Sequence, residues 1–406
     1  MSKLEVDAIE PQSGTTVTIG ASGDTVNVVG TLQNNGGSLA GVTFKEGGTN
    51  FVGSLLVGAD TTGTLNAASC NTGVGFEVFD DLTSGDENTA VGHKALTKLT
   101  TGSDNTAVGR NSGAAITTGL CNTAIGNDSL EKTTSGCYNV AVGKTTMKEN
   151  TTGNNNTAVG KDALFENTTG NQNTALGSSS LCAGTTGDFN TAVGEKSMMG
   201  VVTGDSNAAF GQGSLRCNTS GCFNTALGAA ALSANTTACN NVAVGKSALA
   251  ANTTGTRNTA VGQNTLLSNT TGNENASFGN LSLDANTTGC KNNAFGDSSL
   301  TGNTTGCCNV AIGNAALSSN TTGNSNTAVG INALTTNTTG AFNTAIGESA
   351  LLANTTASNN TAVGKNALIA NTTGCENTAM GRCAMNANTT GDTNTAFGFQ
   401  SMESNL

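Results

Sequence analysis

The chain has 406 residues and a net charge of −11, with 55 Gly, 12 Cys, one His, one Pro and no Trp. Aromatic residues make up 3% and charged residues 11%, which excludes both a bulky aromatic core and a highly charged disordered chain. The acidic balance and the lack of Lys and Arg clusters also exclude a nucleic-acid-binding surface. No run of about 18 apolar residues occurs, so we expect no membrane insertion.

Residues 1–70 have no regular repeat and are expected to form a β-rich docking or capping segment. The stretch TTVTIGASGDTVNVVGTL alternates Thr, Val and Ile, and Gly-rich stretches follow it. The opening MSKLEVDAIEPQSG has Glu5, Asp7 and Glu10 where a secretory signal needs basic and then apolar residues. We therefore expect this chain to be made in the cytoplasm and not exported by that route.

Residues 71–406 form a second region built from a 17-residue repeat. The motif NTAVG or a close variant starts 20 times between Asn71 and Asn394, without an insertion or deletion. Counting that Asn as position 1, position 1 is always Asn and position 5 is always Gly. The residues that we expect to form ladders along the stack are Asn71, Asn88, Asn105, Asn241 and Asn394 at position 1, Gly75, Gly92, Gly245 and Gly398 at position 5, Val91 at position 4, and Leu249 and Leu266 at position 9.

Each unit is predicted to be one coil of a narrow parallel β-solenoid or β-roll, because 17 residues are too few for a helical hairpin repeat. Positions 1–4 and 7–10 are each expected to be a strand. Positions 4 and 9, which are apolar in almost every unit, are expected to be the core. The Gly at position 15 is expected to have a positive φ after Thr-Thr. Twenty coils stacked in register would make a rod of roughly 95 Å.

The distribution of charge supports this all-β fold. All 35 Asp, Glu, Lys and Arg residues from Glu77 onward lie at positions 6, 7, 10, 11, 16 and 17. These positions are therefore expected to face solvent. One coil has only about two large apolar side chains, a thin core for an isolated rod, so we expect further burial against other copies in a parallel homotrimer.

The NTAVG and NTAIG units, with NTTG between them, resemble repeats in fibre and appendage proteins of tailed phages, especially marine ones. The opening MSKLEVDAIEPQSGTTVTIGASGDTV is similar to the amino-terminal segment of the same proteins. The repeats also resemble, more distantly, the NSVAIG-type β-roll heads of trimeric autotransporter adhesins. These resemblances imply a trimeric parallel roll and a structural role, with residues 1–70 joining other virion or fibre proteins.

No catalytic, cofactor or metal site is expected. His93 is the only His and lies at position 6, which we expect to face solvent. We therefore expect neither a catalytic Ser-His-Asp nor a catalytic Cys-His arrangement. The Asn-Thr-Thr strings, for example at Asn150, Asn252 and Asn337, match glycosylation acceptors, but we interpret them as turn residues.

The cysteines leave two readings open. Six of the 12 lie at position 16, and two pairs, Cys222 with Cys239 and Cys290 with Cys307, are one coil apart. Stacked Cα atoms about 4.8 Å apart are within disulfide range, so bridges between coils are geometrically allowed. Free thiols are the favoured reading for a protein that folds in a reducing cytosol.

The sequence therefore predicts a structural virion protein, a trimeric phage tail fibre or spike whose rod contacts an unidentified host-surface receptor. A bacterial surface adhesin or a self-assembling extracellular filament is the first alternative. A second is an ice-binding solenoid, in which the Thr rows at positions 13 and 14 would organise water.

Overall fold

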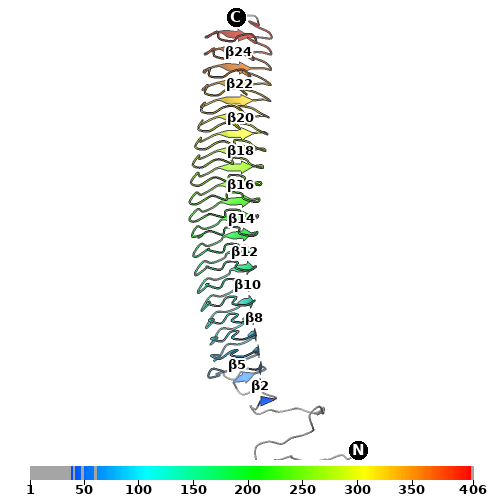
Figure 1. The fold of residues 1–406 in the computed structure, drawn as a ribbon, viewed down its shortest axis with the longest axis vertical. Coiled ribbons are helices and arrows are strands. Elements are labelled where there is room, and N and C mark those ends of the chain that lie inside the picture. The colour runs from blue at the N-terminus through cyan, green and yellow to red at the C-terminus, as the bar shows by residue number, and fades with distance from the viewer. Residues whose placement is uncertain (1–37, 40–41, 47–49, 59–61, 404–406) are drawn as a thin grey trace, which may run out of the picture.

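The computed structural model describes residues 38–39, 42–46, 50–58 and 62–403. Within these ranges the protein is a single column of stacked coils with no helix, and its elements follow one another along the rod in chain order (Figure 1). Most of the predicted docking segment lies outside the described residues.

Each of the 20 predicted units has one three-residue strand at positions 2–4. Every strand pairs in parallel with the strand of the next coil, and the register offset is 17 residues throughout, as in the pairing of Ala90 with Ala107. The parallel β-solenoid with a 17-residue period is thus confirmed. The strands are β6 (Thr72–Val74), β7 (Thr89–Val91), β8 (Thr106–Val108), β9 (Thr123–Ile125), β10 (Val140–Val142), β11 (Thr157–Val159), β12 (Thr174–Leu176), β13 (Thr191–Val193), β14 (Ala208–Phe210), β15 (Thr225–Leu227), β16 (Val242–Val244), β17 (Thr259–Val261), β18 (Ala276–Phe278), β19 (Asn293–Phe295), β20 (Val310–Ile312), β21 (Thr327–Val329), β22 (Thr344–Ile346), β23 (Thr361–Val363), β24 (Thr378–Met380) and β25 (Thr395–Phe397).

The stack begins before residue 71, the predicted boundary. Strand β3 (Phe51–Val52) pairs in parallel with β5 (Ala68–Ser69), and β4 (Leu55–Val57) pairs in parallel with β6 at the same 17-residue offset. Ser54 takes the place of the position-1 Asn, and its hydroxyl accepts the Asn71 N–H at 2.8 Å. The strand pairing and register of this coil follow the repeat, although its sequence does not.

A hairpin covers the first edge of the sheet. Strand β1 (Ser38–Leu39) pairs antiparallel with β2 (Val42–Glu46), which pairs antiparallel with β4. The N–H and C=O groups on that side of β4 therefore bond to β2, where an uncovered edge would invite pairing with another chain.

The prediction of a second strand at positions 7–10 is wrong, because this part of each coil is a series of turns. Positions 7, 9 and 17 have positive φ, for example 60° at Lys94, 49° at Leu96 and 61° at Asp104. Left-handed residues curl the backbone tightly, so 17 residues suffice to close a coil. Their unfavourable conformation is offset by bonds between coils: the Leu96 N–H donates to Ser112 O at 3.0 Å, and the Asp104 N–H donates to Asp86 O at 3.0 Å.

Two glycine rows serve close contact between coils: position 5 is always Gly, and position 15 is Gly except at Ala238 and Ala357. Gly92 at position 5 has φ of 129°, and a Cβ there would lie 2.5 Å from Gly109 O in the next coil. Gly102 at position 15 does not have the positive φ that we expected. A Cβ at Gly102 would instead collide with the Gly119 carbonyl oxygen of the next coil. The preference for Gly in this row is therefore steric rather than conformational, and it is not absolute, since Ala238 and Ala357 occupy the same position.

The interior consists of positions 1, 3, 8, 9, 12 and 15, as the buried residues of the coil that starts at Asn88 illustrate. Leu249 and Leu266 at position 9 are completely buried, as predicted. Val91 at position 4 is 37% exposed, so the prediction that this row belongs to the core is wrong. Side chains alternate faces along a strand, and with the position-3 Ala pointing inward, positions 2 and 4 must point outward.

The position-1 Asn ladder is present and runs along the interior. Asn88 Nδ2 donates to Asn71 Oδ1 at 3.0 Å and to Gly102 O at 3.0 Å, and the same Asn71 oxygen accepts the Asn88 N–H at 3.0 Å. The bond to the preceding Asn recurs at Asn105, at Asn241 and at Asn394. These bonds satisfy buried amides and fix the register between coils.

A second Asn ladder lies at position 12, where we expected turn residues. Asn150, Asn252 and Asn337 are completely buried. Asn167 Nδ2 donates to Asn150 Oδ1 at 2.8 Å, and the equivalent bond to the preceding coil recurs at Asn252 and at Asn337. These side chains fill the coil interior, so the folded rod has no room for a glycan on them.

Candidate interaction surfaces

The outward face of the sheet has a continuous row of apolar side chains, which we call the outer apolar row. It consists of the position-4 residues of β6 to β25, all of which are exposed or half-buried. Phe278 and Phe295 stack within it, with ring centroids 4.9 Å apart and planes 7° from parallel. Because the strands form one column (Figure 1), the row extends along the whole stack. Its members are Val74, Val91, Val108, Ile125, Val142, Val159, Leu176, Val193, Phe210, Leu227, Val244, Val261, Phe278, Phe295, Ile312, Val329, Ile346, Val363, Met380 and Phe397.

No charged side chain interrupts this face. Position 2, which shares it, is Thr, Val, Ala or Asn in every unit, and position 4 is always apolar. Monomeric soluble proteins rarely expose contiguous apolar patches larger than a few hundred Å², and larger patches mark interaction sites. The outer apolar row is therefore a candidate protein–protein interface.

The charged positions face solvent, as predicted. Neighbouring coils place residues 17 apart side by side, which produces ion pairs such as Lys94 with Glu77 at 3.2 Å and Lys132 with Glu149 at 2.6 Å. These side chains are partly exposed, so each pair contributes little stability.

The side chains considered for catalysis lie apart. His93 is exposed and stacks on Phe76, with ring centroids 5.9 Å apart. In the described ranges, no three His, Cys, Asp or Glu side chains are placed to hold a metal ion. Burial raises the pKa of the Asp284 carboxyl. That pKa shift alone does not identify a catalytic site.

The Thr row at position 13 uses its hydroxyls within the rod. Thr100 Oγ1 donates to Thr117 O at 3.0 Å, and Thr321 Oγ1 donates to Thr338 O at 3.0 Å. These hydroxyl protons are not available to order water. The ice-binding alternative would therefore depend on position 14 rather than on both rows.

The two cysteine pairs differ in geometry. Cys290 Sγ lies 2.9 Å from Cys307 Sγ, and its hydrogen bond with that thiol raises the pKa of Cys290 to about 11. In both pairs the second sulfur accepts the N–H of the first Cys, at 3.2 Å for Cys222 and 3.1 Å for Cys290, but the Cys222 thiol donates to Ser220 O at 3.4 Å. All 12 cysteines are free thiols in this structure. Of the two pairs, only Cys290 and Cys307 have a thiol donating to the partner sulfur.

No family model matches the chain, and no curated protein matches it. In the ranges that the structure describes, no helix is long and apolar enough to cross a membrane.

Proposed function

We propose that this chain is a structural virion protein, a fibre or spike of a tailed phage whose stiff rod helps the particle contact its host. The observation that supports it best is the unbroken in-register stack with an uncharged apolar face along its length. The resemblance of its repeats and of its first residues to phage fibre proteins favours a virion over the alternative of a bacterial adhesin or filament.

The outer apolar row supports self-association as a parallel homotrimer. A partner that covers this row must offer apolar groups at the same spacing of about 4.8 Å over 20 coils. A second copy of the chain, parallel and in register, meets that requirement at every coil. Three copies around one axis would bury all three rows and leave the charged positions in solvent, which adds the apolar burial that each thin core lacks.

The amino-terminal segment would join the rod to the virion or to a neighbouring fibre protein. The β1–β2 hairpin supports this arrangement, because its pairing with β4 covers the sheet edge at the end of the rod that the segment precedes in sequence.

The oligomer is tested by light scattering on the full-length protein together with negative-stain images. We expect a mass of three chains and thin rods of about 100 Å. The mass of a single chain would contradict the trimer. The virion role is tested by mass spectrometry of purified phage particles and of bacterial surface fractions, where recovery in the surface fraction alone would favour the adhesin.

A further inference from the structure

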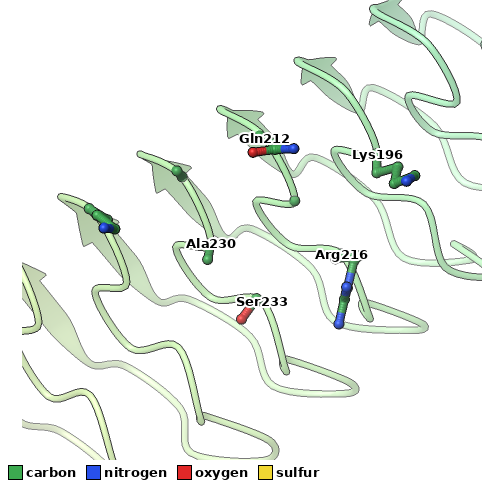
Figure 2. Close-up of a pocket in the computed structure, with 8 residues that line it drawn as sticks. Lys196, Gln212, Arg216, Ala230 and Ser233 are labelled. Atoms are coloured by element: carbon green, nitrogen blue, oxygen red, sulfur yellow. The ribbon is translucent and has the colours of Figure 1, made fainter.

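The outward surface has a hollow over residues 196–246. It forms because two successive coils have small residues where others have long ones: Gly213 and Ala230 at position 7, and Ala229 at position 6. The resulting groove has a volume of about 450 Å³, within the range of small-ligand sites. Figure 2 shows Lys196, then Gln212 with Arg216, then Ala230 with Ser233, on three successive coils around the groove.

Three basic side chains line this groove: Lys196, Arg216 and Lys246. Lys196 pairs with Glu195 at 3.3 Å. Arg216 and Lys246 are exposed, and neither forms an ion pair with any residue in the described ranges. Residues 190–257 contain four basic and two acidic side chains, whereas the whole chain has a net charge of −11. The groove is therefore a local cationic site on an acidic rod.

A second hollow on the rod is lined by lysines of which most are paired. It has a volume of about 400 Å³ and is lined by Lys94 and Lys132, among others, with Glu131 in its wall. There Lys94 pairs with Glu77 at 3.2 Å and Lys132 with Glu149 at 2.6 Å. Of its three lysines only Lys98 forms no ion pair with a residue in the described ranges, whereas the first groove has two such cations, Arg216 and Lys246.

The remaining groups suit a sugar ring. Ala229 and Ala230 give the groove a small apolar surface, against which the C–H face of a pyranose can pack. The Ser233 hydroxyl donates to Ala250 O at 3.2 Å, so its oxygen can still accept a hydrogen bond. Gln212 has only a long contact, 3.4 Å from its Nε2 to Glu195 Oε2, and its amide can turn to bond a sugar hydroxyl.

We propose that this groove binds an acidic saccharide, with its carboxylate between Arg216 and Lys246. An Arg side chain suits a carboxylate because its planar guanidinium can form two parallel hydrogen bonds with it. A long polyanion such as nucleic acid fits less well, because two free cations on a chain of net charge −11 cannot neutralise a run of phosphates. This inference deepens the proposed function and rests on it, because it names the class of host-surface ligand that an attachment rod would contact.

The test uses full-length protein and a trisaccharide of galacturonic acid in low salt, followed by saturation-transfer NMR and titration. We expect saturable binding, weakened about tenfold or more by the double variant Arg216→Ala/Lys246→Ala and reduced by added NaCl. The matched control Lys132→Ala removes a paired cation from the second hollow and should leave binding unchanged. A neutral galactose trisaccharide should bind much more weakly.

Three results would overturn the proposal: no saturable binding to the wild-type protein, equal weakening by Lys132→Ala, or equally tight binding of inorganic phosphate. The outcome is independent of the virion test. A chain found in particles that binds no acidic saccharide contradicts only the ligand assignment. A chain that binds the saccharide but is absent from particles contradicts only the virion role.

Discussion

Replacing Asn309, a buried member of the position-1 ladder, by Leu should destabilise the coils around it. Asn309 Nδ2 donates to Asn292 Oδ1 at 3.2 Å and to Gly323 O at 2.8 Å. Asn309 Oδ1 accepts both the backbone N–H and the Nδ2 of Asn326, at 2.9 and 3.2 Å. Asn309→Leu removes all four bonds at once.

The energetic effect depends on which groups lose their only partner. Gly323 O keeps the Asn320 amide at 3.0 Å, and Asn292 Oδ1 keeps the Asn309 N–H at 3.0 Å. The buried Asn326 N–H is left without an acceptor, at a cost of about 2 kcal/mol, and the other three bonds contribute about 1 kcal/mol each. Burial of the Leu side chain returns about 2 kcal/mol, so the free energy of unfolding should fall by about 3 kcal/mol.

The measurement is urea unfolding followed by circular dichroism, with hydrogen exchange of peptides from residues 292–330 to locate the change. Asn314→Leu is the matched control, because it makes the same substitution in the same coil at an exposed position whose amide has one long contact, 3.4 Å to Asp297. The control should change stability by less than about 0.5 kcal/mol. Equal effects of the two variants would refute the argument that the ladder stabilises the rod.

Four further predictions concern the two apolar rows and the thiol pair. Leu249→Asp puts a charge into the buried position-9 row and should lower the melting temperature and break the rod in negative-stain images, and unchanged rods would contradict the assignment of that row to the core. Val244→Asp lies in the outer apolar row, so it should leave the coil fold intact by circular dichroism while reducing the mass in light scattering from three chains to one; an unchanged mass would move the interface elsewhere. Oxidised glutathione should convert Cys290 and Cys307 to one disulfide, losing two protons and two electrons to the oxidant, and peptide mapping that finds no bridged peptide would rule it out. Because the pKa of Cys290 is about 11, its alkylation in the reduced protein should speed up as the pH rises toward 11, and a rate that levels off below pH 9 would contradict that value.

The sequence was sufficient to predict the repeat, its in-register parallel stacking and its solvent-facing positions. Units of equal length without insertions can stack so that equivalent residues align only at an offset of one whole unit. It was not sufficient to predict which side chains of a coil point inward and which of its segments are strands. Val91 was placed in the core because apolar residues are usually buried, whereas the alternation in Thr89-Ala90-Val91 already required Val91 to share a face with Thr89. The sequence predicts a strand at positions 7–10, because residue types such as those of Lys94 and Leu96 do not indicate a positive φ.

Two features could have been found only by arranging the chain in coils. The position-12 Asn ladder was hidden because Asn-Thr-Thr-Gly is typical of turns, and its burial depends on tertiary closure. The cationic groove was hidden because Lys196, Arg216 and Lys246 are far apart in sequence and occupy different positions of the unit. Its detectable signal was Ala229 and Ala230 at positions 6 and 7, where many other coils have longer side chains.

The uniform 17-residue offset has an evolutionary consequence. Because each coil presents the same hydrogen-bonding edge to the next, loss or gain of one whole unit would rejoin two compatible edges and change the rod length by about 4.8 Å. Recombination between similar repeats in the gene could therefore lengthen or shorten the rod stepwise, while the hairpin at one end and the surface features of the remaining coils stay intact. The length of the rod would then vary independently of the surface features that the remaining coils carry.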